Sequence, residues 1–199
     1  MRRWLPCIAA VIGGVLLGFG SALWLAGLWP QRSTMAFGDV DVGGWRSDFA
    51  VGSKAADPYT RARVARHGLL ALAKTEAVYF TRATDDTGAP LREACSYRLS
   101  GGQMPAGWWS VTLYDRQSML PANTDGALSI DAERAGGGAW SAVIAPARPA
   151  DDGLWISSRG AGSFDLTLRL YMPSAALLSA PDTALTPPRI ERISCEGGE

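Results

Sequence analysis

The sequence begins with an apolar run that is long enough to cross a membrane. Residues 5–29 contain no charged side chain, and 25 residues of α-helix would be about 37 Å long, against about 30 Å of hydrocarbon in a bilayer. Ser21 carries the only hydroxyl in this run, so the polar face that an amphipathic helix of a soluble domain shows is missing. We therefore predict a single N-terminal transmembrane helix within residues 1–30, in contact with the membrane lipid bilayer.

The charges beside this run predict its orientation. Arg2 and Arg3 precede it and only Arg32 follows closely, and positive residues are enriched on the cytoplasmic side of membrane helices. This pattern predicts a single-pass protein of a bacterial inner membrane, with its C-terminal domain in the periplasm. The alternative is a cleaved signal peptide, whose apolar region has about 7–15 residues and ends in small residues. Here the run is longer, and segment 25–29 ends in leucine and tryptophan.

Small residues recur at every fourth position through the run, at Ala10, Gly14, Gly18, Ala22 and Ala26. Gly14 and Gly18 form a G-x-x-x-G pattern, which lets two membrane helices approach closely. This pattern favours helix packing at Gly14 and Gly18, as self-association or as contact with another anchor. The alternative is that alanine and glycine are simply common in membrane helices.

The rest of the chain has the composition of one exported domain. Two of the 19 basic residues precede the run, so residues 31–199 carry 17 basic and 19 acidic residues. The resulting net charge of −2 gives no support for nucleic-acid binding. Cys95 and Cys195 lie in this part, and disulfides persist outside the cytoplasm. A bridge would close a loop of about 100 residues and could stabilise the fold by about 4.7 kcal/mol, with two free thiols as the alternative. With one histidine and no C-x-x-C pattern, we expect no metal site and no cofactor.

Local patterns divide residues 31–199 into a connector and a domain. Residues 31–56 mix Gly, Ser, Asp and single apolar residues, which predicts a connector with room for one short strand. Asp57 can cap a helix that begins at Pro58, and apolar residues at intervals of four predict one amphipathic helix at about 58–75. From residue 76 the period changes to two, which is typical of strands. We therefore predict one β-rich domain over residues 57–199.

Seven segments have the alternation or the aromatic and β-branched content of strands: 77–82, 94–99, 108–114, 128–130, 140–144, 154–156 and 164–171. A turn at 85–88 predicts that the first two form a hairpin. Short strands separated by Gly- and Pro-rich turns predict a mostly β fold, namely a jelly-roll-like antiparallel β-sandwich. The proline-rich tail from Pro173 is predicted to return as an extended segment that ends near Cys195.

Two motifs in these segments resemble a known bacterial family. The motif W-S-V-T-L-Y-D at 109–115 is followed by P-A-N at 121–123, and L-R-L-Y-M-P at 168–173 is followed by two prolines at 187–188. Together they resemble the family called domain of unknown function 1214, over residues 57–193, in a form similar to its membrane-anchored members. The resemblance implies a jelly-roll-like sandwich and a frequent companion, domain of unknown function 1254. It implies no established activity, cofactor or catalytic residue.

Two segments depart from the larger soluble members of that family. Residues 124–127 read T-D-G-A where those members tend to have proline and then Arg-Tyr. Residues 156–158 read I-S-S in place of an apolar-proline turn. The resemblance therefore does not carry over a ligand site built from these turns.

No catalytic constellation is recognisable in the sequence. The pairs Asp85-Asp86 and Asp151-Asp152 have the residue type that glycoside hydrolysis needs, but each stands just before a glycine, where aspartate favours turns. His67 is accompanied by no G-x-S-x-G or P-loop motif, and we interpret it as a helical residue without catalytic function.

The best candidate ligand site is the polar face of the two clearest strands: Trp108, Ser110, Thr112, Tyr114, Arg169 and Tyr171. If these strands are neighbours, aromatic rings, hydroxyls and one guanidinium share a face that suits a sugar or a small anion. The alternative is an ordinary packed or solvated face, with Arg169 paired to Asp115 or Asp165. The sequence thus favours a non-enzymatic, membrane-tethered module of the cell envelope that binds a partner protein or a glycan. The alternative function is an envelope hydrolase that uses this face as its cleft.

Overall fold

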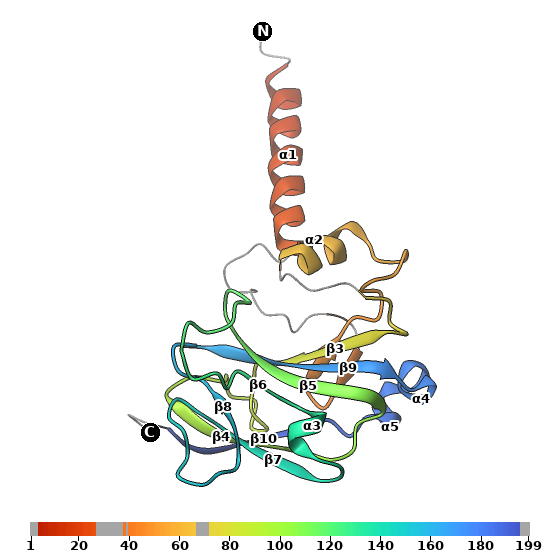
Figure 1. Cartoon of the computed structure of the whole chain (residues 1–199). Coiled ribbons are helices and arrows are strands. Elements are labelled where there is room, and N and C mark those ends of the chain that lie inside the picture. The colour runs from red at the N-terminus through yellow and green to blue at the C-terminus, as the bar shows by residue number, and fades with distance from the viewer. Residues whose placement is uncertain (1–3, 27–37, 39, 67–71, 196–199) are drawn as a thin grey trace.

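The computed structural model describes residues 4–26, 38, 40–66 and 72–195 of the chain. Helix α1 (Leu5–Leu25) projects away from a β-rich domain (Figure 1). Its 21 residues are about 31 Å long, which matches the hydrocarbon thickness of a bilayer. Within the described ranges, α1 is the one helix long and apolar enough to cross a membrane, and its large apolar side chains are exposed. Such a helix is compatible with a single-pass anchor or with a signal sequence.

Two β-sheets, one above the other in Figure 1, form the domain. The larger sheet has the order β1 (Val40–Val42), β2 (Trp45–Ser47), β3 (Ala77–Arg82), β9 (Phe164–Pro173), β5 (Ala106–Asp115) and β6 (Ser129–Asp131). The smaller sheet has the order β10 (Arg189–Cys195), β4 (Cys95–Gly101), β7 (Trp140–Ala145) and β8 (Leu154–Ser157). The mostly β class predicted from the sequence is confirmed, and the jelly-roll connectivity stays a prediction.

The core lies between the two sheets and follows from alternation along the strands. The inward residues of β5 and β9 are all buried, namely Trp109, Val111, Leu113, Leu166, Leu168 and Leu170. The smaller sheet contributes Tyr97, Leu99 and Ile144 from β4 and β7. Trp109 stacks on Trp140 across the layers, with 4.7 Å between the ring centroids. The period of two therefore identified the core-facing residues of the central strands.

The predicted hairpin between β3 and β4 is wrong. β3 pairs with β2 and β9 in the larger sheet, whereas β4 pairs with β10 and β7 in the smaller one. The turn at 85–88 does form, but Asp86 bonds to Ile190 of β10 at 2.8 Å through its backbone N–H. The chain therefore crosses from one sheet to the other at this turn. Alternation shows which residues of a strand share a face, but it does not show which strand lies next to it.

One strand pair departs from the predicted antiparallel arrangement. β7 and β8 run parallel, with Ala142 opposite Leu154. Residues 146–153 bring the chain back along β7 before β8 begins, which a tight hairpin turn would not do. The remaining pairs between the described strands are antiparallel.

The connector and the tail hold more structure than predicted. The connector contains two strands, β1 and β2, joined by Gly43 and Gly44, whose positive φ angles of 60° and 84° suit a tight hairpin turn. Three residues per strand were too few to show a period. The tail is not extended throughout, because helices α4 (Ala175–Ser179) and α5 (Pro181–Ala184) precede β10, and a four-residue helix α3 (Ala132–Ala135) follows β6.

Helix α2 (Pro58–Arg66) begins where predicted and is shorter than predicted. Asp57 caps it as expected, accepting two backbone N–H groups at 2.7 and 3.2 Å. Residues 67–71, with His67, lie outside the described residues. Residues 72–75 are not helical; the carbonyl of Ala73 accepts the N–H groups of Glu76 and Ala77 in a turn that leads into β3.

Candidate functional site

The two strands that carry the predicted ligand site are neighbours. β5 and β9 pair with Trp108 opposite Tyr171 and Ser110 opposite Arg169. Because side chains alternate along a strand, the six predicted residues share the face of the larger sheet that points away from the core. We call this set the aromatic face: Trp108, Ser110, Thr112, Tyr114, Arg169 and Tyr171. Figure 1 shows that this side of the larger sheet looks toward α1 and α2.

Arg169 lies at the centre of the aromatic face. Its Nη1 donates to Thr112 Oγ1 at 2.8 Å, and its Nη2 donates to the hydroxyl of Tyr114. The guanidinium carbon also lies 5.3 Å from the centroid of the Tyr114 ring, a cation–π distance. None of the ion pairs between described residues includes Arg169, so the predicted alternative pairs with Asp115 or Asp165 do not form. The bonded groups that the described part of the chain supplies to this half-buried cation are therefore neutral.

Aromatic rings flank the guanidinium. Trp108 and Tyr171 face each other across the two strands, with 5.4 Å between centroids and 60° between ring planes. Tyr79 of β3 lies opposite Arg169 and belongs to the same face, although it is absent from the predicted site. Burial raises the pKa of Tyr79, as does neighbouring Tyr171, whereas the charge of Arg169 lowers it. The alternation of residues 77–82 predicts which side of its strand Tyr79 faces. The pairing of β3 with β9 is what brings Tyr79 beside Arg169.

Hydroxyl groups form the deeper part of the face. Ser110 and Thr112 are buried, and Thr81 shares a hydrogen bond of 3.1 Å with Thr167. Asp165 is on the same side of β9, opposite Tyr114, and is buried. The face therefore combines rings, hydroxyls and one guanidinium, which suits binding of a polar anion or a sugar.

A second charged cluster ties the 85–88 turn to the C-terminal strand. Asp85 is fully buried, and its Oδ2 accepts from Nε of Arg192 at 2.9 Å and also from Nη2. Arg82 bonds to the backbone carbonyl of Asp85 at 2.7 Å and to the carboxylate of Asp86 at 3.0 Å. Burial alone would raise the pKa of Asp85, but hydrogen bonds from Thr87 and Arg192 and from backbone N–H groups outweigh it and hold the pKa below its usual range. The predicted turn is confirmed, and its ionic partners were missed.

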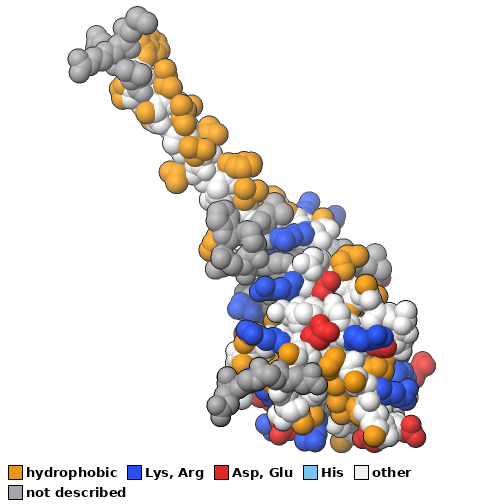
Figure 2. Space-filling view, turned by 90° about the vertical axis from the view of Figure 1, so that its left-hand side faces the viewer, with side chains coloured by type: hydrophobic (Ala, Val, Ile, Leu, Met, Phe, Trp, Pro, Cys, Tyr) orange, Lys and Arg blue, Asp and Glu red, His pale blue; other side chains and the backbone are white. Residues whose placement is uncertain are grey.

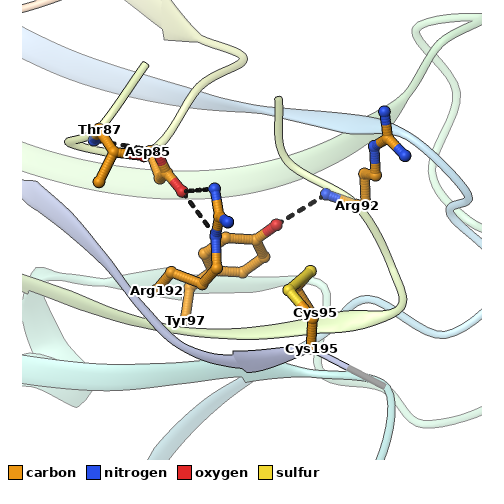
Figure 3. Close-up of a disulfide and its surroundings, with 7 residues drawn as sticks. All are labelled: Asp85, Thr87, Arg92, Cys95, Tyr97, Arg192 and Cys195. Atoms are coloured by element: carbon orange, nitrogen blue, oxygen red, sulfur yellow. Dashed lines mark hydrogen bonds and ion pairs between the residues drawn. A yellow bond between two sulfur atoms is a disulfide. The ribbon is translucent and has the colours of Figure 1, made fainter. Parts of the chain in front are cut away.

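The predicted disulfide lies beside this cluster. Cys95 and Cys195 are bonded to each other and stand opposite one another at the ends of β4 and β10. Figure 3 shows Arg192 beside Tyr97, extending from the same strand pair toward Asp85. The bridge and the ion pair therefore hold β10 at two points, which identifies this end of the molecule as structural.

The two segments that depart from the resembled family contact each other. Asp125 accepts from the hydroxyl of Ser157 at 2.6 Å and from Nε of Arg159 at 3.0 Å. The Arg159 guanidinium beside Asp125 holds the pKa of that carboxyl below its usual range. Asn123 donates to the carbonyl of Arg159 at 2.7 Å. The two departures thus meet in one loop-to-loop contact.

Two further sets of residues singled out in the sequence are Gly14 and Gly18 of α1 and the pair Asp151 and Asp152. A Cβ atom built on Gly14 or Gly18 would meet nothing within 4 Å, so this side of α1 is open. Asp151 and Asp152 are exposed in the loop before β8. In the described ranges, no group of three or more His, Cys, Asp and Glu side chains could hold a metal ion.

Comparison with known proteins shows a family and a fold. A family model described as protein of unknown function, DUF1214, matches residues 76–175, which is half of the chain and includes β3 through β9. No curated protein matches the sequence significantly.

Two solved structures are similar to this chain. The crystal structure of the VPA0106 protein from Vibrio parahaemolyticus is 18% identical, with a TM-score of 0.57, over 91% of this chain and 44% of that one. An uncharacterized protein from Burkholderia cenocepacia is 17% identical, with a TM-score of 0.41, over 95% of this chain and 52% of that one. The chain thus spans about half the length of either protein. The first similarity supports the fold.

Proposed function

We propose a function from one premise: this chain belongs to the DUF1214 family of proteins of unknown function. In our proposal it is a non-enzymatic binding module of the bacterial cell envelope. Helix α1 tethers it to the inner membrane, and the β domain lies in the periplasm. Its ligand is an anionic sugar, alone or within a glycan, held on the aromatic face.

The observation that carries this proposal is the environment of Arg169. Its guanidinium is oriented by Thr112 and Tyr114, which are neutral, so its positive charge is not offset by a bonded carboxylate among the described residues. A planar guanidinium binds carboxylates and phosphates with two parallel hydrogen bonds. Trp108 and Tyr171 supply ring faces of the kind that pack against the apolar side of a sugar.

Three features support the proposed location. Helix α1 has the length and composition of a membrane span, and Arg2 and Arg3 precede it. The Cys95–Cys195 bridge is of the kind that persists in oxidising compartments such as the periplasm. The aromatic face looks toward the side from which α1 leaves the domain (Figure 1), so a ligand there would be close to the membrane.

A titration of the detergent-solubilised full chain tests the proposal. Glucuronate and glucose 6-phosphate serve as anionic probes, and glucose is the neutral control. We expect saturable changes in tryptophan fluorescence with the anionic sugars only. Arg169→Gln should weaken binding at least tenfold, whereas Arg98→Gln, which removes an exposed charge on the opposite sheet, should not change it. Equal binding by both variants would contradict the proposal.

A hydrolase screen separates this function from the enzymatic alternative. Turnover of a glycan substrate that is lost in both Arg169→Ala and Tyr114→Phe, in folded protein, would favour an envelope hydrolase. Absence of turnover together with tight binding of the probes is the result we expect.

Two protein contacts complete the proposal. A companion protein with domain of unknown function 1254 is the first partner to test, by co-purification of the two full chains from membranes. Self-association through α1 is the second, and Gly14→Leu with Gly18→Leu should reduce cross-linked dimer if the open side of α1 packs against another copy. Ala9→Leu with Gly13→Leu, on a neighbouring side of the same helix, is the matched control.

A further inference from the structure

Helix α2 contacts the end of α1, and this contact sets its position relative to a membrane. Arg63 donates from Nε and Nη2 to the carbonyl oxygen of Leu25, at 2.9 and 2.5 Å. Leu25 is the last residue of α1, and the last carbonyl groups of a helix have no partner inside it. The guanidinium of Arg63 therefore lies level with the end of the apolar span. Figure 1 shows α2 lying across this end.

One side of α2 packs on the domain and the other side is exposed. Thr60 is buried, and its hydroxyl oxygen lies 3.3 Å from Asp48 Oδ2. Tyr59, Arg61 and Arg66 are exposed. Figure 2 shows Lys and Arg side chains grouped beside the base of the long helix. The helix thus presents cations at the point where the chain would leave the membrane.

The charge of this segment is strongly positive. Residues 54–66 contain Lys54 and three arginines against one acidic residue, a net charge of +3. That acidic residue, Asp57, caps the helix and also accepts from the Thr60 hydroxyl at 2.7 Å. Arg61 donates to the backbone carbonyl of Ala56 at 3.0 Å, which is a neutral partner. Among the described residues, Asp48 also lies against the helix, with its Oδ2 3.3 Å from the Thr60 hydroxyl and its Oδ1 accepting the N–H of Ala50.

We propose that α2 lies in the headgroup layer of the membrane and binds the phosphate groups of anionic lipids through Arg61, Arg63 and Arg66. This inference rests on the proposed anchoring of α1. Charge complementarity supports it, because basic side chains at a lipid surface attract anionic headgroups. Continuity supports it too, because the Arg63–Leu25 contact joins α2 directly to the span. Lipid binding at α2 would fix the tilt of the domain and hold the aromatic face toward the membrane.

The experiment measures lipid contact of α2 in the full chain. The protein is labelled with a nitroxide at Ala62→Cys, an exposed position of α2, with Cys7→Ser to remove the other free thiol. It is reconstituted in nanodiscs of pure phosphatidylcholine or of phosphatidylcholine with about 30% phosphatidylglycerol, whose negative charge attracts basic side chains. Accessibility to lipid-soluble oxygen is compared with accessibility to an aqueous nickel chelate.

We expect the ratio of oxygen to nickel accessibility to be at least about threefold higher in anionic discs than in neutral ones. The triple variant Arg61→Gln, Arg63→Gln and Arg66→Gln should abolish this difference. The control triple Arg98→Gln, Arg134→Gln and Arg148→Gln, with the same loss of charge on exposed sites outside α2, should retain it. Equal ratios in both kinds of disc, or retention of the difference by the first triple, would overturn the proposal.

Carbonate extraction of membranes separates this inference from the function on which it rests. Wild type and both triple variants should stay in the membrane pellet if α1 anchors the chain. Extraction of the wild type would refute the anchor itself. Retention in the pellet, together with a ratio of oxygen to nickel accessibility that does not depend on lipid charge, would refute only the role of α2.

Discussion

Two arginines of this molecule lie in contrasting environments. Arg192 binds the carboxylate of Asp85, which is fully buried, beside a disulfide that closes the same strand pair. Arg169 is held by two hydroxyl groups and an aromatic ring. The charge of the first is neutralised by a buried carboxylate, whereas none of the ion pairs between described residues includes the second. In our proposal, bonded partners rather than burial separate the structural Arg192 from the ligand-binding Arg169.

The largest effect should come from removing the bridge beside Arg192. Cys95 and Cys195 are 100 residues apart, and their bond restricts the unfolded chain. Cys95→Ser with Cys195→Ser should lower the free energy of unfolding by up to about 4.7 kcal/mol on the chain-entropy model. Urea denaturation followed by tryptophan fluorescence measures this. Cys7→Ser, at an exposed thiol of α1, is the control and should have no effect.

Breaking the ion pair of Arg192 should have the next largest effect. Asp85→Asn keeps the side-chain volume and removes the charge, which leaves Arg192 without its carboxylate. Arg192 is partly exposed and water can solvate its charge, so the cost comes from the hydrogen bonds lost at the buried Asp85 side chain, about 1 to 3 kcal/mol. The same urea titration measures it. A free energy of unfolding within about 1 kcal/mol of wild type would show that this region does not depend on the pair.

A smaller effect is expected from pH. The folded pKa of Asp85 is below its ordinary value of 3.8, so the carboxylate stabilises the fold above that pH and this contribution is lost as the pH falls through the folded pKa. Below about pH 4, wild type should therefore lose stability more steeply than Asp85→Asn. Asp152→Asn, in an exposed loop, should follow the wild-type curve. Parallel curves for wild type and Asp85→Asn would contradict the assignment.

The smallest effect on stability should come from Arg169. Arg169→Gln removes two hydrogen bonds to neutral hydroxyls, those of the buried Thr112 and of Tyr114, and should change the free energy of unfolding by less than about 1 kcal/mol. Arg192→Gln is the matched variant in the same assay. A larger loss for Arg169→Gln than for Arg192→Gln would reverse the comparison.

The sequence predicted which side chains share a face of a strand better than it predicted which strands pair. Alternation placed Trp108 and Arg169 on polar faces, and the structure pairs those faces as the ligand-site hypothesis required. Tyr79 was missed because its strand was assigned to a hairpin that does not form. Local patterns report the period of a strand, whereas its neighbours depend on contacts across the whole chain.

Distance along the chain also explains the missed ion pairs. The turn residue Asp85 was recognised from its local motif, but its partner Arg192 is 107 positions away. The same holds for Asp125 and Arg159, which are 34 positions apart on two loops. The disulfide could be predicted from the sequence because only two cysteines follow the apolar run. Where several partners exist, as for arginine, the sequence does not choose among them.

The most direct test of the central claim measures binding and stability on the same variant. For Arg169→Gln, the dissociation constant for glucuronate and the free energy of unfolding are determined together, beside Arg98→Gln. We predict binding at least about tenfold weaker with stability changed by less than about 1 kcal/mol, because the guanidinium serves the ligand rather than the fold. Unchanged binding, or a loss of stability as large as that of Asp85→Asn, would contradict the account.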